Sequence, residues 1–120
     1  MIIQKQKLSH VELFAGLGSA SIALRSVSTL FETVAYSEIC TKAEAVRAIL
    51  VKDGARNIGD ITDDSNWRDD KRLKDIDLVT AGFPCQDFSG MNQNASGWNS
   101  PRTRFVHHAH TTEICRDGKR

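Results

Sequence analysis

Apolar runs and polar intervals alternate along the chain in a way that predicts strands and helices in turn. Short runs rich in β-branched, aromatic or aliphatic residues are typical of strands that are buried on both faces of a parallel sheet. Four such runs lie at residues 10–14, 32–38, 55–60 and 75–83. Strands that alternate with helical segments predict right-handed crossovers and a mostly parallel sheet with helices on its faces.

The segment "GSASIALRSVSTLF", residues 18–31, predicts the first helix. Its apolar residues recur at the spacing of one helical face, and they are Ala20, Ala23, Leu24, Val27 and Leu30. Ser19 is the expected N-cap, because a serine hydroxyl can accept a hydrogen bond from the free amides of a first helical turn.

The segment "TKAEAVRAILVKDG", residues 41–54, predicts a second helix. Thr41 and Glu44 form a capping-box pattern at its start. Gly54 stands where a C-terminal cap belongs. An apolar stripe is expected to face the sheet, and it consists of Ala43, Val46, Ile49 and Leu50.

The stretch "TDDSNWRDDKRLKDID", residues 62–77, has six acidic and four basic residues. This mixed charge predicts a solvated linker or a weak surface helix. The 120 residues show no internal repeat, low-complexity tract or domain boundary. A length of this order fits a single domain.

Charge and cysteine usage exclude several classes of protein. The net charge of +1 gives no overall basic footprint for nucleic acid. The three cysteines, Cys40, Cys85 and Cys115, are odd in number and widely spaced, which disfavours a disulfide framework or a zinc ribbon. Each is expected to be a free thiol in a reducing compartment, and Cys40 is expected to be a small packed residue.

Neither a membrane segment nor a metal site is expected. The apolar runs are far shorter than the ~20 residues that a membrane span needs, and the first ten residues lack the pattern of a signal peptide. The expected location is therefore the cytoplasm. A cluster of histidines has no partner ligands at usual metal-site spacing, so a helix surface is the expected place of His107, His108 and His110.

Residues with distinctive chemistry follow each predicted strand. In open α/β sheets, ligands bind outside the carboxyl ends of the strands. Gly16 and Gly18 in "FAGLGSAS" allow a tight turn and a close approach to a ligand, although a plain tight turn would also use them. The dinucleotide fingerprint would require glycine where Ser21 stands, which disfavours a pyrophosphate site.

Two acids extend this predicted pocket. Glu38 ends the second strand, where an acid in this fold class hydrogen-bonds ribose hydroxyls, and the alternative is an exposed surface glutamate. Asp60 in "GDI" either caps the segment that follows it or accepts a hydrogen bond from an adenine amino group. Together these positions predict a pocket for a nucleoside without a pyrophosphate.

The fourth strand runs into "GFPCQDFS", in which Cys85 directly follows Pro84. Proline fixes its own φ and favours an extended conformation of the residue before it. This stiff exit from the strand would hold the Cys85 thiol at the rim of the sheet. The alternative is that Cys85 is a small core residue.

These motifs resemble those of the DNA cytosine C5-methyltransferases. "FAGLGS" resembles the first cofactor motif of that family, "SEIC" the acid-bearing second motif and "GDI" the third. "GFPCQDFS" is similar to the catalytic motif and is the most specific match. The resemblance covers roughly residues 10–105. It implies a Rossmann-like, S-adenosylmethionine-dependent methyltransferase fold of the α/β class, with a truncated parallel sheet and helices on both faces.

The resemblance also implies a pocket for S-adenosylmethionine. Phe14 would pack on the adenine, and Glu38 would hold the ribose. Asp60 and Ile61 would read the adenine edge. The other cofactor-binding residues that the resemblance implies are Ala15, Gly16, Gly18, Pro84 and Ile39, the last of which stands where family members often have an aromatic residue.

The implied reaction gives the Cys85 thiol a role. Cytosine C5 is a poor nucleophile, and attack of the Cys85 thiolate on C6 makes C5 able to accept the methyl group. Loss of the C5 proton then releases the enzyme. The thiolate is the attacking species, so the reaction requires a lowered pKa and access to the base.

Double-stranded DNA is the implied partner. The target base must leave the duplex to reach the thiol, and the loop 86–105 has the length and composition to close over it. Gln86 and Ser89 are implied DNA-binding residues. Arg102 and Arg104 are either phosphate contacts or solvated surface arginines.

Residues 1–120 resemble only the N-terminal portion of the catalytic domain, because no Glu-Asn-Val segment, recognition region or C-terminal motif follows. One expectation is a split enzyme that a second polypeptide completes. The other is a truncated, inactive chain that binds only S-adenosylmethionine or a nucleoside. An unpaired edge at strand 75–83 also predicts self-association.

Two further classes compete with a methyltransferase. A nucleoside-binding module without chemistry would use the same glycines and acids. A thiol hydrolase with its cysteine in "PCQ" would need a histidine-bearing motif near another strand end, and the other predicted strand ends carry none.

Overall fold

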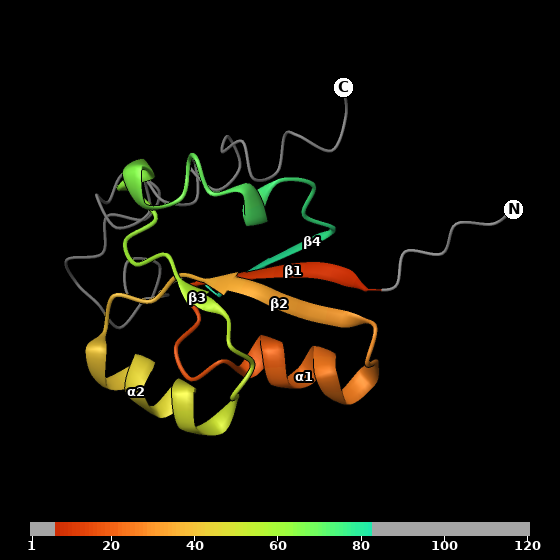
Figure 1. The fold of residues 1–120 in the computed structure, drawn as a ribbon. Helices are drawn as coiled ribbons and strands as arrows, with labels where there is room; N and C mark the ends of the chain where they lie inside the picture. Colours follow the sequence, from red (N-terminus) through yellow and green to blue (C-terminus); the bar gives the residue numbers. More distant parts are fainter. Residues whose placement is uncertain (1–6, 83–120) are drawn as a thin grey trace, which may run out of the picture.

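A computed structural model of the protein describes residues 7–82 (Figure 1). Several residues named above lie outside this range, and their roles stay predictions: Pro84, Cys85, Gln86, Ser89, Arg102, Arg104, Cys115 and the three histidines of residues 107–110.

Four parallel strands form one sheet in the order β3-β2-β1-β4 (Figure 1). The strands are β1 (Leu8–Leu13), β2 (Phe31–Tyr36), β3 (Arg56–Asn57) and β4 (Leu78–Ala81). Two α-helices, α1 (Ser19–Val27) and α2 (Thr41–Leu50), connect the first three strands. The parallel α/β architecture expected from the sequence is therefore confirmed.

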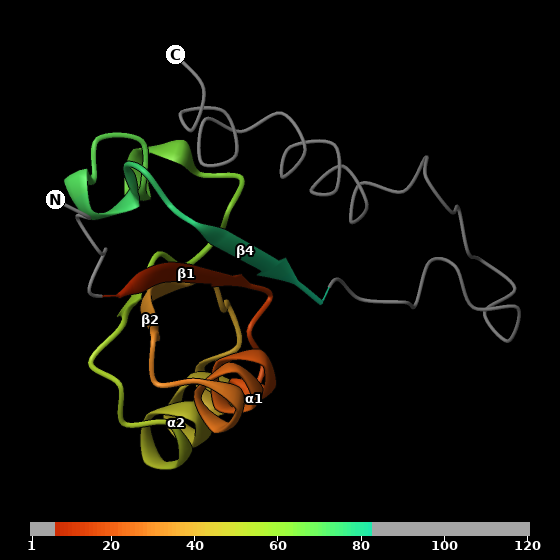
Figure 2. The ribbon, with the colours of Figure 1, turned by 90° about the vertical axis from the view of Figure 1, so that its right-hand side faces the viewer.

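The layers on the two faces of the sheet differ. Figure 2 shows α1 and α2 together on one face. On the other face lie two short 3₁₀ turns, η1 (Asp64–Asn66) and η2 (Lys71–Leu73). The helix expected after Cys85 lies outside the described range. None of the helices within residues 7–82 has the length and apolar character that crossing a membrane requires.

The hydrophobic core fills the space between the sheet and the 3₁₀ turns. Successive side chains of a strand point to opposite faces, and β1 sends Val11 and Leu13 into this core. The other buried members are Ala35, Ile58, Ile61, Trp67 and Leu73.

The prediction of a solvated linker or surface helix for residues 62–77 is only partly right, because most of these residues are exposed but they form 3₁₀ turns and contribute to the core. Trp67 and Leu73 from this stretch are buried in the core, and the Trp67 indole N–H donates to the Ile61 carbonyl at 3.1 Å. The Asp63 and Asp70 side chains accept hydrogen bonds from backbone amides two residues on, which starts a 3₁₀ turn at each place.

Both predicted N-caps need correction, although α2 begins at Thr41 as expected. Gly18, not Ser19, is the N-cap of α1, and it adopts a left-handed conformation with φ of 86°. Cys40, not Thr41, is the N-cap of α2, and neither cap makes a side-chain hydrogen bond. The expected capping box is therefore absent from α2. Cys40 is exposed rather than packed.

The expected inward stripe of α2 is wrong for most of its members, since only Ala43 is half-buried. Val46, Ile49 and Leu50 of α2 are exposed, with Ile49 69% exposed. The side chains that α1 and α2 bury are Ser21 and Arg47. The reason lies in the face of the sheet that the helices cover. There β1 presents the buried residues His10 and Glu12, and buried polar groups need polar partners.

The end of α2, the length of β3 and the burial of β2 differ from the predictions. α2 ends at Leu50, so its C-cap is Val51 and not Gly54. β3 contains only two residues, because the Asn57 side chain replaces the next backbone pairing with β2. β2 is fully buried only at Ala35 and Tyr36, near its carboxyl end.

Candidate functional site

A cavity of about 350 Å³ opens where β1 and β4 end and α1 begins. The chain passes from β1 through α1 to β2 on one side, while β4 lies on the other side of β1. Such a reversal of strand order is where open α/β sheets bind ligands. The lining residues are Glu12, Leu13, Phe14, Ala15, Ser19, Ala20, Thr80, Ala81 and Gly82. Two predicted site residues, Phe14 and Ala15, thus lie at this cavity.

The glycine turn between β1 and α1 needs each glycine for a different reason. Gly16 has φ of 54°, and a Cβ built on it would meet no atom within 4 Å. Its open side leaves room for a ligand to approach the backbone. A Cβ on Gly18 would lie 2.6 Å from Val51 Cγ2, so Gly18 permits close packing of the turn on the end of α2. Phe14 also adopts a left-handed conformation, with φ of 54°.

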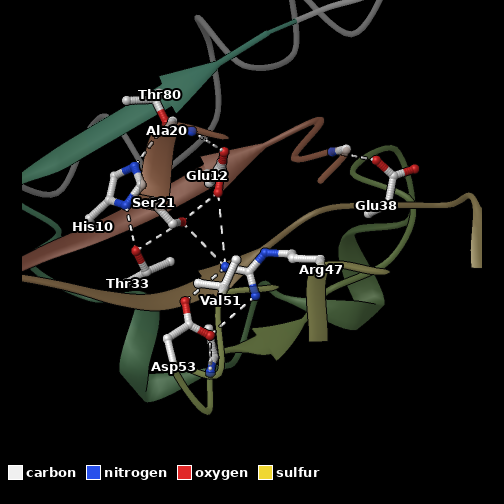
Figure 3. A network of polar contacts seen from close by, with 12 residues as sticks. His10, Glu12, Ala20, Ser21, Thr33, Glu38, Arg47, Val51, Asp53 and Thr80 are labelled. Atoms are coloured by element: carbon white, nitrogen blue, oxygen red, sulfur yellow. Dashed lines mark hydrogen bonds and ion pairs between the residues drawn. The ribbon is translucent and has the colours of Figure 1, made fainter. Parts of the chain in front are cut away.

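Glu38 reaches back from the end of β2 to this turn (Figure 3). One carboxylate oxygen accepts from the Gly16 N–H at 2.7 Å, and the other accepts from the Cys40 N–H at 2.7 Å. The Asn57 side chain in turn pairs with both backbone groups of Glu38. A carboxylate oxygen has two lone pairs, so Glu38 is held in place with capacity for further donors.

The structure therefore brings Gly16 and Glu38 together, although 22 residues separate them. Asn57 is a supporting residue that the sequence reasoning missed. Its signal was an asparagine directly before an apolar residue at the end of a predicted strand, which is also ordinary for a turn.

Among residues 7–82, Phe14 and Ala15 are the predicted cofactor-binding residues that line the cavity, while Gly16 and Gly18 belong to the neighbouring turn that Glu38 contacts. Asp60, Ile61 and Ile39 belong to neither group. One Asp60 oxygen accepts from the Thr62 N–H at 2.9 Å and from the Thr62 hydroxyl at 2.6 Å, which is the capping arrangement. The Ile61 side chain is buried in the core. Ile39 is 74% exposed beside Glu38. Roles for these residues in cofactor binding stay predictions.

A buried polar network lies between the sheet and the two helices (Figure 3). Glu12 accepts hydrogen bonds from the Ala20 N–H at 2.9 Å and from the Ser21 hydroxyl at 2.5 Å. Arg47 donates to both oxygens of Asp53, at 3.2 and 2.9 Å. The sequence signals were Glu12, an acid inside a buried strand, and Arg47, an arginine within a helix. The pattern of apolar positions does not indicate which residues pair with them.

His10 extends the network across three strands. Its two ring nitrogens lie 2.8 Å from the hydroxyl oxygens of Thr33 on β2 and Thr80 on β4. Burial lowers the pKa of the imidazole, which favours its neutral form, in which one ring nitrogen donates and the other accepts. Burial raises the pKa of the Asp53 carboxyl, but hydrogen bonds from Arg47 and Ala55 outweigh it and leave that pKa lowered.

The comparisons with known proteins agree with this geometry. The model of the C-5 cytosine-specific DNA methylase family matches residues 8–109. The chain therefore belongs to the C-5 cytosine-specific DNA methylase family, and its sheet and helices have the S-adenosylmethionine-dependent methyltransferase fold of that family. The resemblance inferred from the four motifs is confirmed.

Individual relatives match over most of the chain. An orphan methyltransferase of Bacillus phage rho11s is 38% identical over 84 residues, which are 69% of this chain and 16% of the relative. An orphan methyltransferase of Bacillus phage SPR is 33% identical over 106 residues, 88% of this chain and 23% of the relative. The type II methyltransferase M.HhaI of Haemophilus parahaemolyticus is 38% identical over 82 residues, 68% of this chain. The chain thus spans less than a quarter of the length of these relatives.

Proposed function

We propose that the chain is the N-terminal portion, residues 1–120, of the catalytic domain of a cytoplasmic DNA (cytosine-5-)-methyltransferase. The observation that carries the proposal is the contact between Glu38 and Gly16 at the carboxyl edge of the sheet. It places a fixed carboxylate beside a glycine turn and near an open cavity, in a chain of the C-5 cytosine-specific DNA methylase family.

The described residues suit S-adenosylmethionine as the cofactor. Gly16 leaves its side of the turn open, and the Glu38 carboxylate can accept from a ribose diol. Ser21 is occupied by the buried network, which fits a nucleoside without a pyrophosphate. Phe14 and Ala15 lie at the cavity, and the other proposed cofactor contacts are Gly18, Ile39, Asp60, Ile61 and Pro84.

Cys85 is the proposed nucleophile. Its thiolate attacks C6 of the cytosine, which makes C5 able to accept the methyl group that S-adenosylmethionine supplies. Removal of the C5 proton and departure of the thiolate then restore the aromatic base. The nucleophile follows β4, whose end lines the cavity beside β1.

Double-stranded DNA is the proposed substrate, with the target base flipped out of the duplex. Gln86 and Ser89 follow the nucleophile and are proposed to contact the flipped nucleotide. Arg102 and Arg104 are proposed phosphate contacts, which would position the duplex without reading its sequence.

The Glu38→Ala substitution is expected to weaken binding of S-adenosylmethionine to the chain about 10- to 150-fold, the effect of losing a hydrogen bond to a charged group. The affinity of Glu38→Gln should lie between those of the wild type and Glu38→Ala, because the glutamine amide oxygen still accepts a hydrogen bond. Isothermal titration calorimetry measures all three affinities.

The matched control is Glu32→Ala, which removes an exposed glutamate from β2, the strand that precedes Glu38. Its affinity should equal that of the wild type. Equal affinities of wild type and Glu38→Ala would remove Glu38 from the site. No heat of binding by the wild type at millimolar cofactor would contradict the proposed pocket itself.

A complementing polypeptide, or self-association of the chain, is proposed to cover surfaces that the described residues leave open. Within residues 7–82, β4 pairs with β1 alone. Unpaired strand edges invite pairing with another chain. Several large apolar residues of the helical layer are also exposed, among them Val27, Ile49 and Leu50.

Light scattering over a dilution series is expected to show a mass above that of the 13.3 kDa monomer that falls on dilution. Addition of a polypeptide with the rest of the catalytic domain should replace the self-associated species by a defined complex and yield methyl transfer. A complex that binds cofactor but transfers no methyl group would favour the inactive-chain alternative. A monomer at every concentration, with slow amide exchange in β4, would show that this edge is already covered.

A further inference from the structure

Arg47 is a buried cation at the centre of the polar network, and its side chain is 2% exposed (Figure 3). It donates to both oxygens of Asp53 and, at 3.3 Å, to the Ser21 hydroxyl. Its Nη2 lies 3.9 Å from a Glu12 oxygen, and its guanidinium lies 3.7 Å from the centroid of the Tyr36 ring. One side chain on α2 thus joins β1, β2, α1 and the segment after α2.

Stability alone is a poor explanation for such a group. Moving charges out of water is costly, and apolar residues of similar volume in place of a buried ion cluster are often neutral or stabilising. Here two carboxylates, Glu12 and Asp53, share one buried cation. The cluster also fixes the geometry of the groups that it holds, and apolar side chains in its place would not do so.

Glu12 connects Arg47 to the start of α1. Its two oxygens accept from the Ala20 N–H and from the Ser21 hydroxyl, both in the first turn of that helix. A carboxylate at a helix N-terminus also interacts favourably with the helix dipole. Glu12 and Ala20 both line the cavity at the ends of β1 and β4, so the position of this carboxylate shapes that cavity.

Arg47 also packs directly on the glycine turn. A Cβ built on Gly18 would lie 3.0 Å from Arg47 Cγ and 3.2 Å from Arg47 Nε. Among residues 7–82, this Nε is a buried side-chain atom without a hydrogen-bond partner. The aliphatic stem and Nε therefore limit how closely the turn approaches α2, while the terminal nitrogens hold Glu12 and Ser21.

We infer that Arg47 is a positioning residue of the cofactor site. From α2 it holds the turn at residues 15–18 and the first turn of α1 in the geometry in which the Gly16 N–H meets Glu38. The identity of the ligand in this inference rests on the proposed function. The positioning is a property of the chain and is measurable without any ligand.

Amide hydrogen exchange by NMR tests the positioning on Arg47→Met, which keeps length and burial but removes the charge, and on Arg47→Lys. We expect the Gly16 and Ala20 amides of Arg47→Met to exchange at least about tenfold faster than in the wild type, the scale of one lost charged hydrogen bond. Arg47→Lys should restore part of the protection. The exchange rates of amides within β1 and β2 should change only as far as the change in the free energy of unfolding predicts. That free energy is measured on the same samples.

Arg68→Met is the matched control, because it removes an exposed arginine whose ion pair with Asp64 lies on the opposite face of the sheet. It should leave the Gly16 and Ala20 exchange rates unchanged. If Arg47→Met does not fold, the comparison of Arg47→Lys with the wild type carries the same test. Unchanged exchange at Gly16 and Ala20, or uniform acceleration that also includes β1 and β2, would overturn the inference.

Titration with S-adenosylmethionine separates this inference from the proposed function. Affinity should fall about tenfold or more in Arg47→Met and be partly recovered in Arg47→Lys. If the wild type binds no cofactor, the proposed function fails, and the exchange rates still decide whether Arg47 positions the turn. If the turn loosens while affinity is unchanged, the turn does not hold the cofactor and the inference is wrong.

Discussion

Cys85→Ser is expected to reduce methyl transfer on the order of a thousandfold or more, the scale seen when an enzyme loses its nucleophile. A serine hydroxyl at neutral pH is a far weaker nucleophile than a thiolate, so C6 of the cytosine is no longer attacked. Binding of S-adenosylmethionine should survive, because the described pocket residues are unchanged. The measurement is transfer of a labelled methyl group to DNA by the chain together with the rest of the catalytic domain.

Cys40→Ser is the control for this experiment, because Cys40 is an exposed thiol of the same chain. Its rate of transfer should match that of the wild type. Substantial activity of Cys85→Ser would refute the nucleophile assignment. Loss of activity in both variants would indicate that the assay reports general damage to thiols or to folding.

Gly18→Ala is expected to lower the free energy of unfolding by about 2 to 5 kcal/mol. A left-handed conformation costs a residue with a Cβ about 1 to 2 kcal/mol, and Gly18 has φ of +86°. The new methyl group would also lie 2.6 Å from Val51 Cγ2, and overpacking typically costs about 1 to 3 kcal/mol more. Cofactor affinity should fall too, because relief of this clash displaces the glycine turn. Urea denaturation and calorimetric titration measure the two effects.

Gly54→Ala isolates the backbone part of that loss. Gly54 has φ of +69°, and a Cβ built there would meet no atom within 4 Å. The Gly54→Ala substitution should therefore lower the free energy of unfolding by only about 1 to 2 kcal/mol, the cost of the left-handed conformation. Equal losses for Gly18→Ala and Gly54→Ala would mean that Val51 moves away at no cost, and that close packing does not explain the glycine.

Local patterns were enough to predict the order of the elements. Apolar runs and helical spacing are properties of short windows, and they indicated β1, α1, β2, α2 and β4 with the parallel arrangement that the structure has. The strand-end rule also placed Gly16 and Glu38 at one edge of the sheet, where they form a hydrogen bond. Parallel strands bring their carboxyl ends to the same edge whatever lies between them, so position in the chain was sufficient.

Local patterns failed where two faces of an element had to be distinguished. On α2, the regular apolar positions predicted an inward stripe, but Ile49 is exposed and Arg47 is buried. On residues 62–77, the high charge predicted a solvated segment, but Trp67 and Leu73 complete the core. In both cases some partners lie far away in the sequence: Ser21 and Glu12 for Arg47, beside the nearby Asp53, and the apolar face of the sheet for Trp67.

The sequence by itself determined the class of fold and the family, because these depend on periodicity and on motifs of a few residues. Only the tertiary structure decided which side chains support the site. Asn57 holds Glu38 from the neighbouring strand, and Arg47 on α2 donates to Ser21 on α1. The physical reason is that a buried polar group must find its partners in space, and no short window of sequence contains both members of such a pair.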